Sequence, residues 1–359
     1  PVGNGKNTVM NTNQRFRTAR QTSRLHALAA FSLLLTITAS GLAEAASSAS
    51  IIMYHRFGEA EYPSTSVTLE QLEAHIAELK SAKYSVLPLG QIVDRLIAGQ
   101  SLPERAVAIT IDDAYRTTYT EAWPRFRAAG LPITVFVATS HIDRGSSKRL
   151  TWDQLREMAA ADVTIGQHSV THLHMPTATP EQNRREIADA SARFTAELGL
   201  KPDIFAYPYG ETSLAVTETV IAGGFKAAFG QHSGVAVSGG NMFYLPRFAM
   251  NEKYGDIERL RLAINALALP VADVTPRDPM IGLTNPPAMG FTVVGEIGKL
   301  DRLRCFTSHA GKARLERLGK NRFEIRSETP FPRGRTRLNC TQPTVDGRWR
   351  WYGRQFFRP

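Results

Sequence analysis

Two adjacent carboxylates stand directly after a run of apolar and β-branched residues. The run from Ala106 to Ile111 is typical of a buried strand, and Asp112 and Asp113 follow it at once. Two negative charges beside a buried strand are costly unless a cation meets them. A metal ion would do so, with one carboxylate as its ligand and the other free to act as a base. An Asp-Asp pair alone is more often a solvated turn, so further ligands are needed.

A pair of histidines supplies such ligands. His168 and His172 lie four residues apart, just after a predicted strand at Val163–Gly166. On a helical turn this spacing projects both imidazoles to one side, where they can share a metal ion. An isolated H-x-x-x-H pattern is more often not a metal site. Its position after a strand, like that of the Asp pair, favours one here, and the offset of His174 suits an outer or surface role.

A third segment joins an aromatic–proline–aromatic–glycine turn to a strand end. It runs Phe205-Ala206-Tyr207-Pro208-Tyr209-Gly210. Such a turn can aim a backbone N–H into a pocket while a ring forms its wall. Taken alone, the segment is interpreted more simply as a packed turn.

The elements that position these residues alternate between strands and helices from Ser50 to about Leu269. Helices are expected from Thr68 onward and at 118–129, 152–160 and 180–198. Strands are expected at 51–54, 106–111, 133–138, 163–166, 203–207, 226–229 and 243–247. Such alternation implies parallel strands with right-handed crossovers. We therefore predict the α/β class, as a distorted or incomplete (β/α) barrel, whose site lies at the carboxyl ends of the strands.

In this order and spacing, the three segments resemble the NodB-type polysaccharide deacetylases, carbohydrate esterase family 4. That family carries T-F-D-D-G, H-[ST]-x-x-H and R-x-P-Y blocks on a distorted (β/α) barrel, and the likeness covers roughly residues 50–270. The Tyr-Pro-Tyr-Gly and Met-Tyr-His segments look similar to the subgroup that acts on poly-N-acetylglucosamine. The combination is specific, although each block alone is not.

The resemblance implies a role for each matching residue. Asp113, His168 and His172 would be the ligands of a divalent metal ion, zinc being the expected one. Asp112 would be the general base, and the backbone N–H of Tyr209 would help to hold the oxyanion. Three protein ligands leave room for water and substrate, as catalytic zinc sites require.

The sequence also departs from the family pattern. The Phe and Gly of the first block are Ile111 and Ala114, and the Arg of the third block is Ala206, so the usual partner of the base is missing. Arg247, after a later predicted strand, is the candidate replacement in the catalytic set.

The remaining candidates concern substrate binding and the general acid. His55 follows the first strand, and with Tyr207 and Tyr209 it completes the expected substrate-binding set. No clear counterpart of the family's late Leu-x-His block is present. His232, His309 and His55 remain open as the acid.

Four segments are expected along the chain. Residues 1–45 are interpreted as a signal peptide, with a basic leader, the apolar run Leu25–Ala39 and a small-residue cleavage site at Ala43-Glu44-Ala45. An uncleaved anchor is the alternative. The barrel would occupy 46–269, a linker 270–290 and a small β-rich module 291–359. After signal removal we expect no stable membrane span, and an exported protein, periplasmic or secreted.

The C-terminal module combines cysteines, cations and aromatic rings. Cys305 and Cys340 are the chain's two cysteines and are expected to form a disulfide in an oxidising compartment. Residues 300–359 hold 15 Lys and Arg against five Asp and Glu, whereas residues 46–299 carry a net charge of −4. This pattern is compatible with binding of an anionic envelope glycan. Nucleic acid would fit the composition too, but an exported protein seldom meets it. Rings packed in the module's core beneath solvated arginines are the slightly favoured interpretation.

The expected function is removal of acetyl groups, N-acetyl rather than O-acetyl, from an acetylated polysaccharide of the cell envelope or an exopolysaccharide. Two alternatives remain: an O-acetyl (xylan-like) esterase, and a catalytically lapsed barrel that only binds glycan. Glycoside hydrolysis would need two carboxylates about 5–10 Å apart across a cleft. Adjacent Asp112 and Asp113 with paired histidines fit a metal site better.

Overall fold

A curled sheet of parallel strands forms the first part of the molecule, for which the computed structural model describes residues 47–295 and 297–359. Its strand order is β10-β1-β5-β6-β7-β8-β9, with β4 beside β5 and β11 beside β1. The strands are β1 (Ser48–Tyr54), β4 (Ser85–Val86), β5 (Ala106–Asp112), β6 (Ile133–Val137), β7 (Thr164–Gln167), β8 (Ile204–Ala206), β9 (Ala227–Phe229), β10 (Ala236–Val237) and β11 (Phe248–Ala249). A further short pair joins β2 (Arg56–Phe57) to β3 (Ser66–Val67). The expected α/β class and incomplete (β/α) barrel are confirmed.

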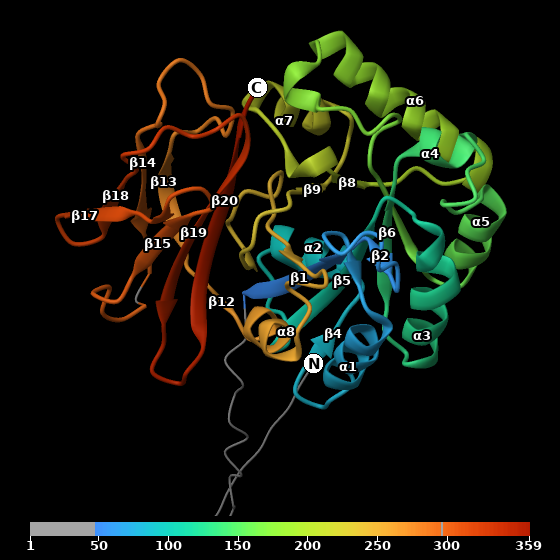
Figure 1. The fold of residues 1–359 in the computed structure, drawn as a ribbon, viewed down its shortest axis with the longest axis horizontal. Coiled ribbons are helices and arrows are strands. Elements are labelled where there is room, and N and C mark those ends of the chain that lie inside the picture. Colours follow the sequence, from blue (N-terminus) through green and yellow to red (C-terminus); the bar gives the residue numbers. More distant parts are fainter. Residues whose placement is uncertain (1–46, 296) are drawn as a thin grey trace, which may run out of the picture. The chain divides into compact units, whose positions relative to one another are not determined.

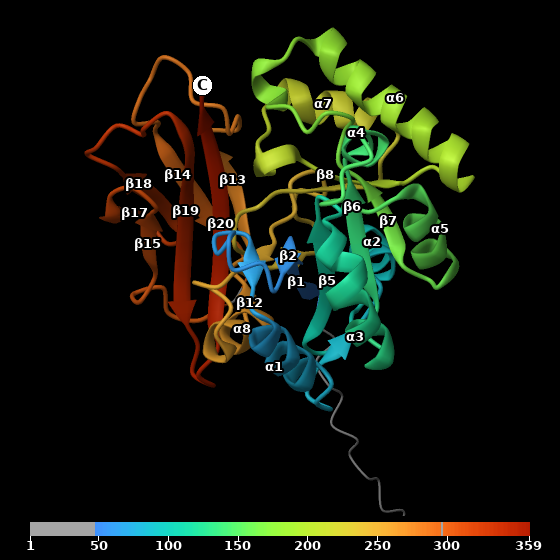
Figure 2. The same ribbon diagram turned by 45° about the vertical axis from the view of Figure 1, so that its right-hand side comes forward.

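Helices cover the outer side of this sheet (Figures 1 and 2). They are α1 (Leu69–Leu79), α2 (Leu89–Ile97), α3 (Trp123–Ala128), α4 (Thr139–Asp143), α5 (Trp152–Ala160), α6 (Pro180–Leu198), α7 (Leu214–Ala222) and α8 (Ile257–Ile264), with short η1 (Thr118–Ala122), η2 (Met175–Thr177) and η3 (Pro208–Gly210). Capping boxes start α1, α5 and α6, where Thr68, Thr151 and Thr179 each accept a hydrogen bond from the third helical residue. Strands β5 and β6 are buried along their whole length, as expected of parallel strands that are covered on both faces.

The barrel's open side is spanned by an irregular segment. The stretch 243–247, expected to be a strand, makes only a single bridge, from Leu245 to Phe229, and β11 then pairs with β1. Pro246 lies between these two contacts, and proline has no N–H to extend a ladder. Arg247 therefore lies in the segment that contacts β9 at its first end and β1 at its second.

Two antiparallel sheets form the C-terminal module. One has the order β12-β20-β19-β15-β16 and the other β13-β14-β18-β17. The strands are β12 (Leu267–Ala268), β13 (Val271–Thr275), β14 (Met289–Val293), β15 (Arg304–Thr307), β16 (Gly311–Lys312), β17 (Arg314–Leu318), β18 (Arg322–Arg326), β19 (Gly334–Pro343) and β20 (Trp349–Arg358). The expected linker 270–290 thus includes β13 and reaches β14, because Val271 and Ala272 pair with Val293 and Thr292.

Strand β20 lies against the barrel as well as in the module. It pairs with β12 at the end of the barrel, and the Trp351 ring meets Phe248 of β11 edge-on at 5.3 Å. At Gly353 the approach is so close that a Cβ atom would lie 1.8 Å from the Ser233 carbonyl oxygen. Only glycine permits this contact, which places β20 of the module against the loop between β9 and β10 that carries Ser233.

The expected signal peptide at 1–45 lies outside the described residues. Within the described part of the chain, no helix combines the length and apolar character that crossing a membrane requires.

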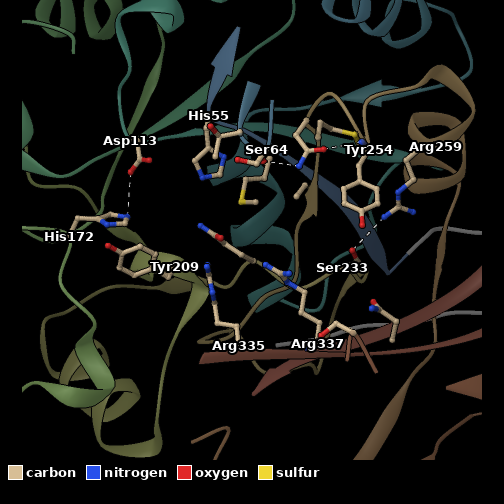
Figure 3. Close-up of a pocket in the computed structure, with 18 of the residues that line it drawn as sticks. His55, Ser64, Asp113, His172, Tyr209, Ser233, Tyr254, Arg259, Arg335 and Arg337 are labelled. Atoms are coloured by element: carbon tan, nitrogen blue, oxygen red, sulfur yellow. Dashed lines mark hydrogen bonds and ion pairs between the residues drawn. The ribbon is translucent and has the colours of Figure 1, made fainter. Parts of the chain in front are cut away.

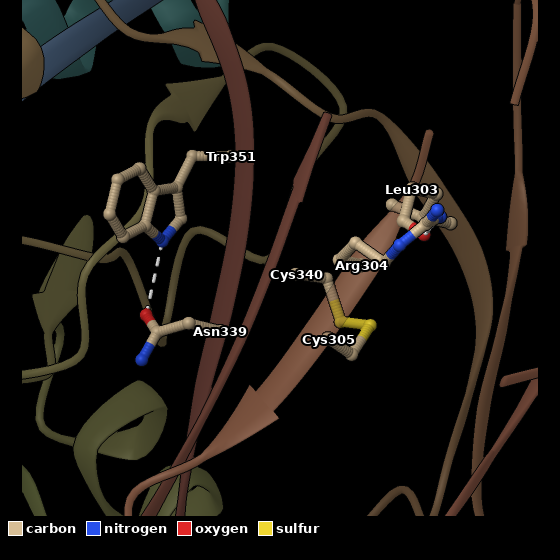
Figure 4. Close-up of a disulfide and its surroundings, with 6 residues drawn as sticks. All are labelled: Leu303, Arg304, Cys305, Asn339, Cys340 and Trp351. Atoms are coloured by element: carbon tan, nitrogen blue, oxygen red, sulfur yellow. Dashed lines mark hydrogen bonds between the residues drawn. A yellow bond between two sulfur atoms is a disulfide. The ribbon is translucent and has the colours of Figure 1, made fainter. Parts of the chain in front are cut away.

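The two cysteines are joined in the structure. Cys305 of β15 and Cys340 of β19 stand opposite each other in the ladder and form a disulfide that closes 35 residues of chain (Figure 4). Both are fully buried in a core with Phe291, Phe323 and Leu338. The bond thereby links two adjacent strands of one sheet of the module.

We expect the double variant Cys305→Ala/Cys340→Ala to lower the free energy of unfolding of the module by about 3–4 kcal/mol, because opening a loop of this length restores chain entropy to the unfolded state. Denaturant unfolding with and without a reducing agent measures the loss. The reductant should destabilise the wild type and leave the double variant unchanged. Equal midpoints for oxidised and reduced wild type would contradict the prediction.

Candidate active site

Chemistry-bearing side chains gather at the carboxyl ends of neighbouring parallel strands. Asp112 ends β5, His168 follows β7 and Tyr209 follows β8, while His55 follows β1. Strands β1, β5, β6, β7 and β8 pair in this order, all in parallel, so their carboxyl ends share one rim. The strand alternation alone places these residues near one another.

Asp113, His168 and His172 form a cluster of metal-ligating atoms. The three donor atoms lie within 4.8 Å of one another. The distance from Asp113 Oδ1 to His172 Nε2 is 3.4 Å, and to His168 Nε2 it is 3.7 Å. Two imidazole nitrogens and one carboxylate oxygen are a donor set that suits zinc and related divalent ions.

The hydrogen bonding of the cluster also fits a metal ion. His168 Nδ1 lies 2.6 Å from the Ala206 carbonyl oxygen, which orients Nε2 toward Asp113. The buried atoms Asp113 Oδ1 and His168 Nε2 have no hydrogen-bond partner among the described residues. Burial, with the neighbouring His168, lowers the pKa of His172 to about 3, so its imidazole is neutral and its nitrogen free to coordinate. These residues would hold the ion.

The two histidines converge for a different reason from the one expected. Residues 168–172 form a bent loop and not a helical turn. Ser169 and His172 have φ values of +66° and +61°, and these left-handed residues fold the loop back on itself. Ser169 Oγ also accepts a hydrogen bond from the His172 N–H. The loop brings the two ring centroids to 4.7 Å.

Asp112 forms a buried ion pair with Arg247. Both side chains are 0% exposed, and the guanidinium donates to both carboxylate oxygens at 2.7 Å. Arg247 also donates from Nε to the Gly230 carbonyl oxygen and from Nη1 to Thr110 Oγ1. Burial alone would raise the pKa of Asp112, but the charge and hydrogen bonds of Arg247, together with the nearby His168 and His55, outweigh it and hold the pKa below its usual value. Arg247 thus lies where the expected partner of the base is needed.

Tyr209 forms a wall beside the metal-ligand cluster. It adopts φ +59° in the turn after β8, and its ring meets His172 edge-on at 4.4 Å and stacks on His174 at 4.1 Å. Its carbonyl oxygen accepts a hydrogen bond from Gln355 Nε2 of β20. The C-terminal module therefore supports the turn that carries Tyr209.

The position of Tyr207 differs from the expected one in the substrate-binding set. Its side chain is fully buried, its hydroxyl donates to the Phe243 carbonyl oxygen, and its ring packs on Phe205 and Tyr244. It does not line the cleft. The turn at Pro208 sends neighbouring side chains to opposite sides, so Tyr209 faces the site and Tyr207 the core.

The site opens into a cleft of about 890 Å³ between barrel and module. Barrel residues on its lining include His55, Asp113, His172 and Tyr209, and β19 contributes Arg335 and Arg337 (Figure 3). Sequence reasoning did not assign this wall to the module, because the contact joins segments far apart in the chain.

One further histidine on this rim was missed. His141 of α4 lines the cleft, its ring lies 5.8 Å from that of His172, and its buried Nδ1 has no partner among the described residues. Burial is the main cause that lowers its pKa, to about 4. A sequence signal for it was available, since His141 comes three residues after the predicted strand 133–138.

The structure distinguishes among the three histidines that the sequence left open as the general acid. His55 lines the cleft. His232 is buried against Tyr244 in a different cavity, and burial lowers its pKa to about 3. His309 packs on Phe331 inside the module. Of these three, only His55 faces the candidate site.

Comparisons with known proteins agree with this geometry. The sequence profile of the polysaccharide deacetylase family matches residues 99–228. The putative polysaccharide deacetylase YxkH of Bacillus subtilis is 28% identical over 197 residues, which cover 55% of this chain and 69% of that protein. The poly-beta-1,6-N-acetyl-D-glucosamine N-deacetylase of Escherichia coli K12 is 24% identical over 48% of this chain, and the match spans only 32% of that protein.

A solved structure shows the same fold. The Streptococcus pyogenes deacetylase PplD, in complex with acetate, superposes with a TM-score of 0.56 at 22% identity and covers 60% of this chain and 98% of that one. The resemblance read from the three sequence blocks is confirmed by the profile and the two relatives. Residues 99–228 of this chain thus match the polysaccharide deacetylase family, and the chain is similar to a poly-beta-1,6-N-acetyl-D-glucosamine N-deacetylase.

Proposed function

We propose that this protein hydrolyses N-acetyl groups of an exported or envelope polysaccharide at a divalent metal site, with zinc as the ion. The observation that carries the proposal is the convergence of Asp113, His168 and His172 beside the buried Asp112–Arg247 pair, with Asp113 and His172 on the lining of an open cleft. Intact ligands and an intact candidate base support catalysis over a role in binding alone.

The roles follow from position. A divalent ion held by the three ligands would polarise the acetyl carbonyl and make water more acidic. Asp112, kept ionised by Arg247, accepts a proton from the attacking water, whose oxygen bonds to the acetyl carbon. The backbone N–H of Tyr209 helps to stabilise the oxyanion. The C–N bond then breaks, acetate leaves, and the amine takes up the proton that Asp112 removed from water, relayed through a cleft histidine, His55 or His141.

The substrate class and the compartment rest on separate observations. The relative from Escherichia coli bears the name of an N-deacetylase of poly-beta-1,6-N-acetyl-D-glucosamine, which favours an N-acetylated glycan over an O-acetyl ester. The Cys305–Cys340 disulfide favours an oxidising compartment and therefore export.

The first test concerns the metal ligands. We expect His168→Ala and His172→Ala to weaken zinc binding by more than about 100-fold, since even the loss of an outer partner of a ligand costs about 10–100-fold. Metal content and competitive zinc titration measure the effect without an activity assay. His174→Ala is the matched control, because His174 lies outside the cluster and should keep the metal. Full zinc occupancy in both ligand variants would refute the assignment.

The second test concerns the base. Asp112→Asn should keep the metal but lower kcat for acetate release from N-acetylglucosamine oligomers by about 10²–10⁴-fold, the usual contribution of general base catalysis. Chelation should abolish wild-type activity, and added zinc should restore it. Metal-loaded wild-type protein that releases no acetate from any N-acetylated oligomer would disprove the proposed function.

The third test concerns Arg247. Arg247→Met should lower the free energy of unfolding by about 3–5 kcal/mol, because it leaves the Asp112 charge buried without a partner. The double variant Arg247→Met/Asp112→Leu should be more stable than Arg247→Met alone. Arg261→Met, at a partly exposed ion pair, is the control and should change stability by about 1 kcal/mol or less. Equal losses in Arg247→Met and Arg261→Met would contradict the role of the buried pair.

A further inference from the structure

Guanidinium groups dominate the charge of the cleft. Arg149 and Arg259 come from the barrel, and Arg335 and Arg337 come from β19 of the module. Asp113 is the one carboxylate among the described residues that line the cleft, and it belongs to the candidate metal cluster. Beyond that cluster, the charged side chains of the lining are therefore all positive.

Arg337 lacks a counter-charge. In the part of the chain that the structure describes, no carboxylate lies within ion-pairing distance of its guanidinium, and the residue is half-buried. Burial lowers the pKa of Arg337, and the charge of neighbouring Arg335 lowers it further. A cation that is withdrawn from water is normally paired. Since the described residues do not supply the partner, the cleft is suited to receive an anion from outside.

Two further arginines are similarly placed. Arg335 has one carboxylate within reach, Glu211 at 3.7 Å, and that carboxylate is already held by His174 at 2.6 Å. Arg259 contacts Ser233 Oγ only at 3.5 Å and otherwise lies over the Trp351 ring at 5.1 Å. Both therefore retain donors for a ligand.

The module presents its arginines by strand alternation. Arg335, Arg337 and Asn339 line the cleft, whereas Thr336, Leu338 and Cys340 between them are buried on the other face of β19. Figure 3 shows Arg335 and Arg337 rising from the strand, with His172 and Tyr209 to one side and Tyr254 and Arg259 to the other.

Aromatic rings line the same cleft. Tyr254 and Phe306 are 47% and 42% exposed, and Trp351 lies between barrel and module. Exposed rings beside guanidinium groups suit a sugar chain that carries negative charge, because sugar faces pack on rings and arginine pairs with carboxylate or phosphate.

We propose that the substrate of this cleft is an acidic acetylated glycan, in which a carboxylate or phosphate near the acetylated sugar binds Arg335 and Arg337. This inference rests on the proposed function, since it assigns the substrate class of the same site. A neutral polymer would cover Arg337 without giving it a counter-charge and would leave Arg335 with only its 3.7 Å contact to Glu211, whereas an acidic polymer supplies the missing charge.

The test compares three N-acetylated oligosaccharides of equal length: a neutral one, one with a uronate and one with a phosphate. The metal-loaded wild type should show kcat/KM at least about tenfold higher for an acidic oligomer, as expected for a single charge-assisted contact, and the preference should shrink as salt rises. The better of the two acidic oligomers identifies the source of the charge.

Variants assign the preference to residues. Arg335→Gln/Arg337→Gln should lower the ratio of acidic to neutral kcat/KM by about tenfold or more, mainly through KM, and Arg337→Lys should retain part of it. Arg333→Gln and Arg314→Gln remove the same charge from the module outside the cleft and should leave the ratio unchanged. Equal rates on neutral and acidic oligomers, or equal effects of cleft and control variants, would overturn the inference.

A binding experiment distinguishes a failure of this inference from a failure of the proposed function. Calorimetry with Asp112→Asn and acetyl-free uronate or phosphate oligosaccharides should show binding that depends on Arg335 and Arg337. Such binding without acetate release from any oligomer would overturn the deacetylase proposal and keep the acidic ligand. Acetate release from the neutral oligomer alone would overturn the acidic ligand and keep the deacetylase proposal.

Discussion

The buried pair of Asp112 and Arg247 is the constraint on which the site depends. Neither side chain is exposed to solvent, so both charges must be met inside the protein. The four hydrogen bonds from Arg247 reach Asp112, Thr110 and the Gly230 carbonyl, and they tie the end of β5 to the segments after β9. The stretch that spans the open side of the barrel is therefore held in place by the group that keeps the candidate base ionised.

Barrel closure and site chemistry are thus coupled. Segment 245–249 bridges β9 at Leu245 and pairs with β1 at Phe248, and Arg247 lies between these contacts. Its side chain can point inward because Pro246 interrupts the ladder there. The sequence has Ala206 where the family pattern has arginine, and Arg247, from another strand end, pairs with the candidate base Asp112.

Whether a feature could be predicted from the sequence depends on how far apart in the chain the interacting residues lie. The positions of Asp112, Asp113 and His168 were predictable, because each lies at or just after the end of a strand whose apolar pattern is local. The shape of the 168–172 loop was not, since it depends on left-handed φ values at Ser169 and His172. Tyr207 was misplaced by the turn at Pro208.

The wall of the cleft was beyond sequence reasoning for a different reason. Arg335 and Arg337 were part of a basic region that suited a solvated surface as well as a binding site. Which alternating face of β19 meets the barrel is decided by β20, which packs on Ser233 through Gly353 and on Phe248 through Trp351. Such long-range packing leaves no periodic signal in the chain.

The hydrogen bond from Gln355 to the Tyr209 carbonyl has a consequence for the order of events during synthesis. The metal-ligand residues are complete once His172 has been made, 183 residues before Gln355. The Ala206 carbonyl that orients His168 also precedes β20, so the candidate metal cluster can assemble before the strand that braces the Tyr209 turn has been made. Maturation of the site is then a late step, which follows the docking of β20 and not the folding of the barrel.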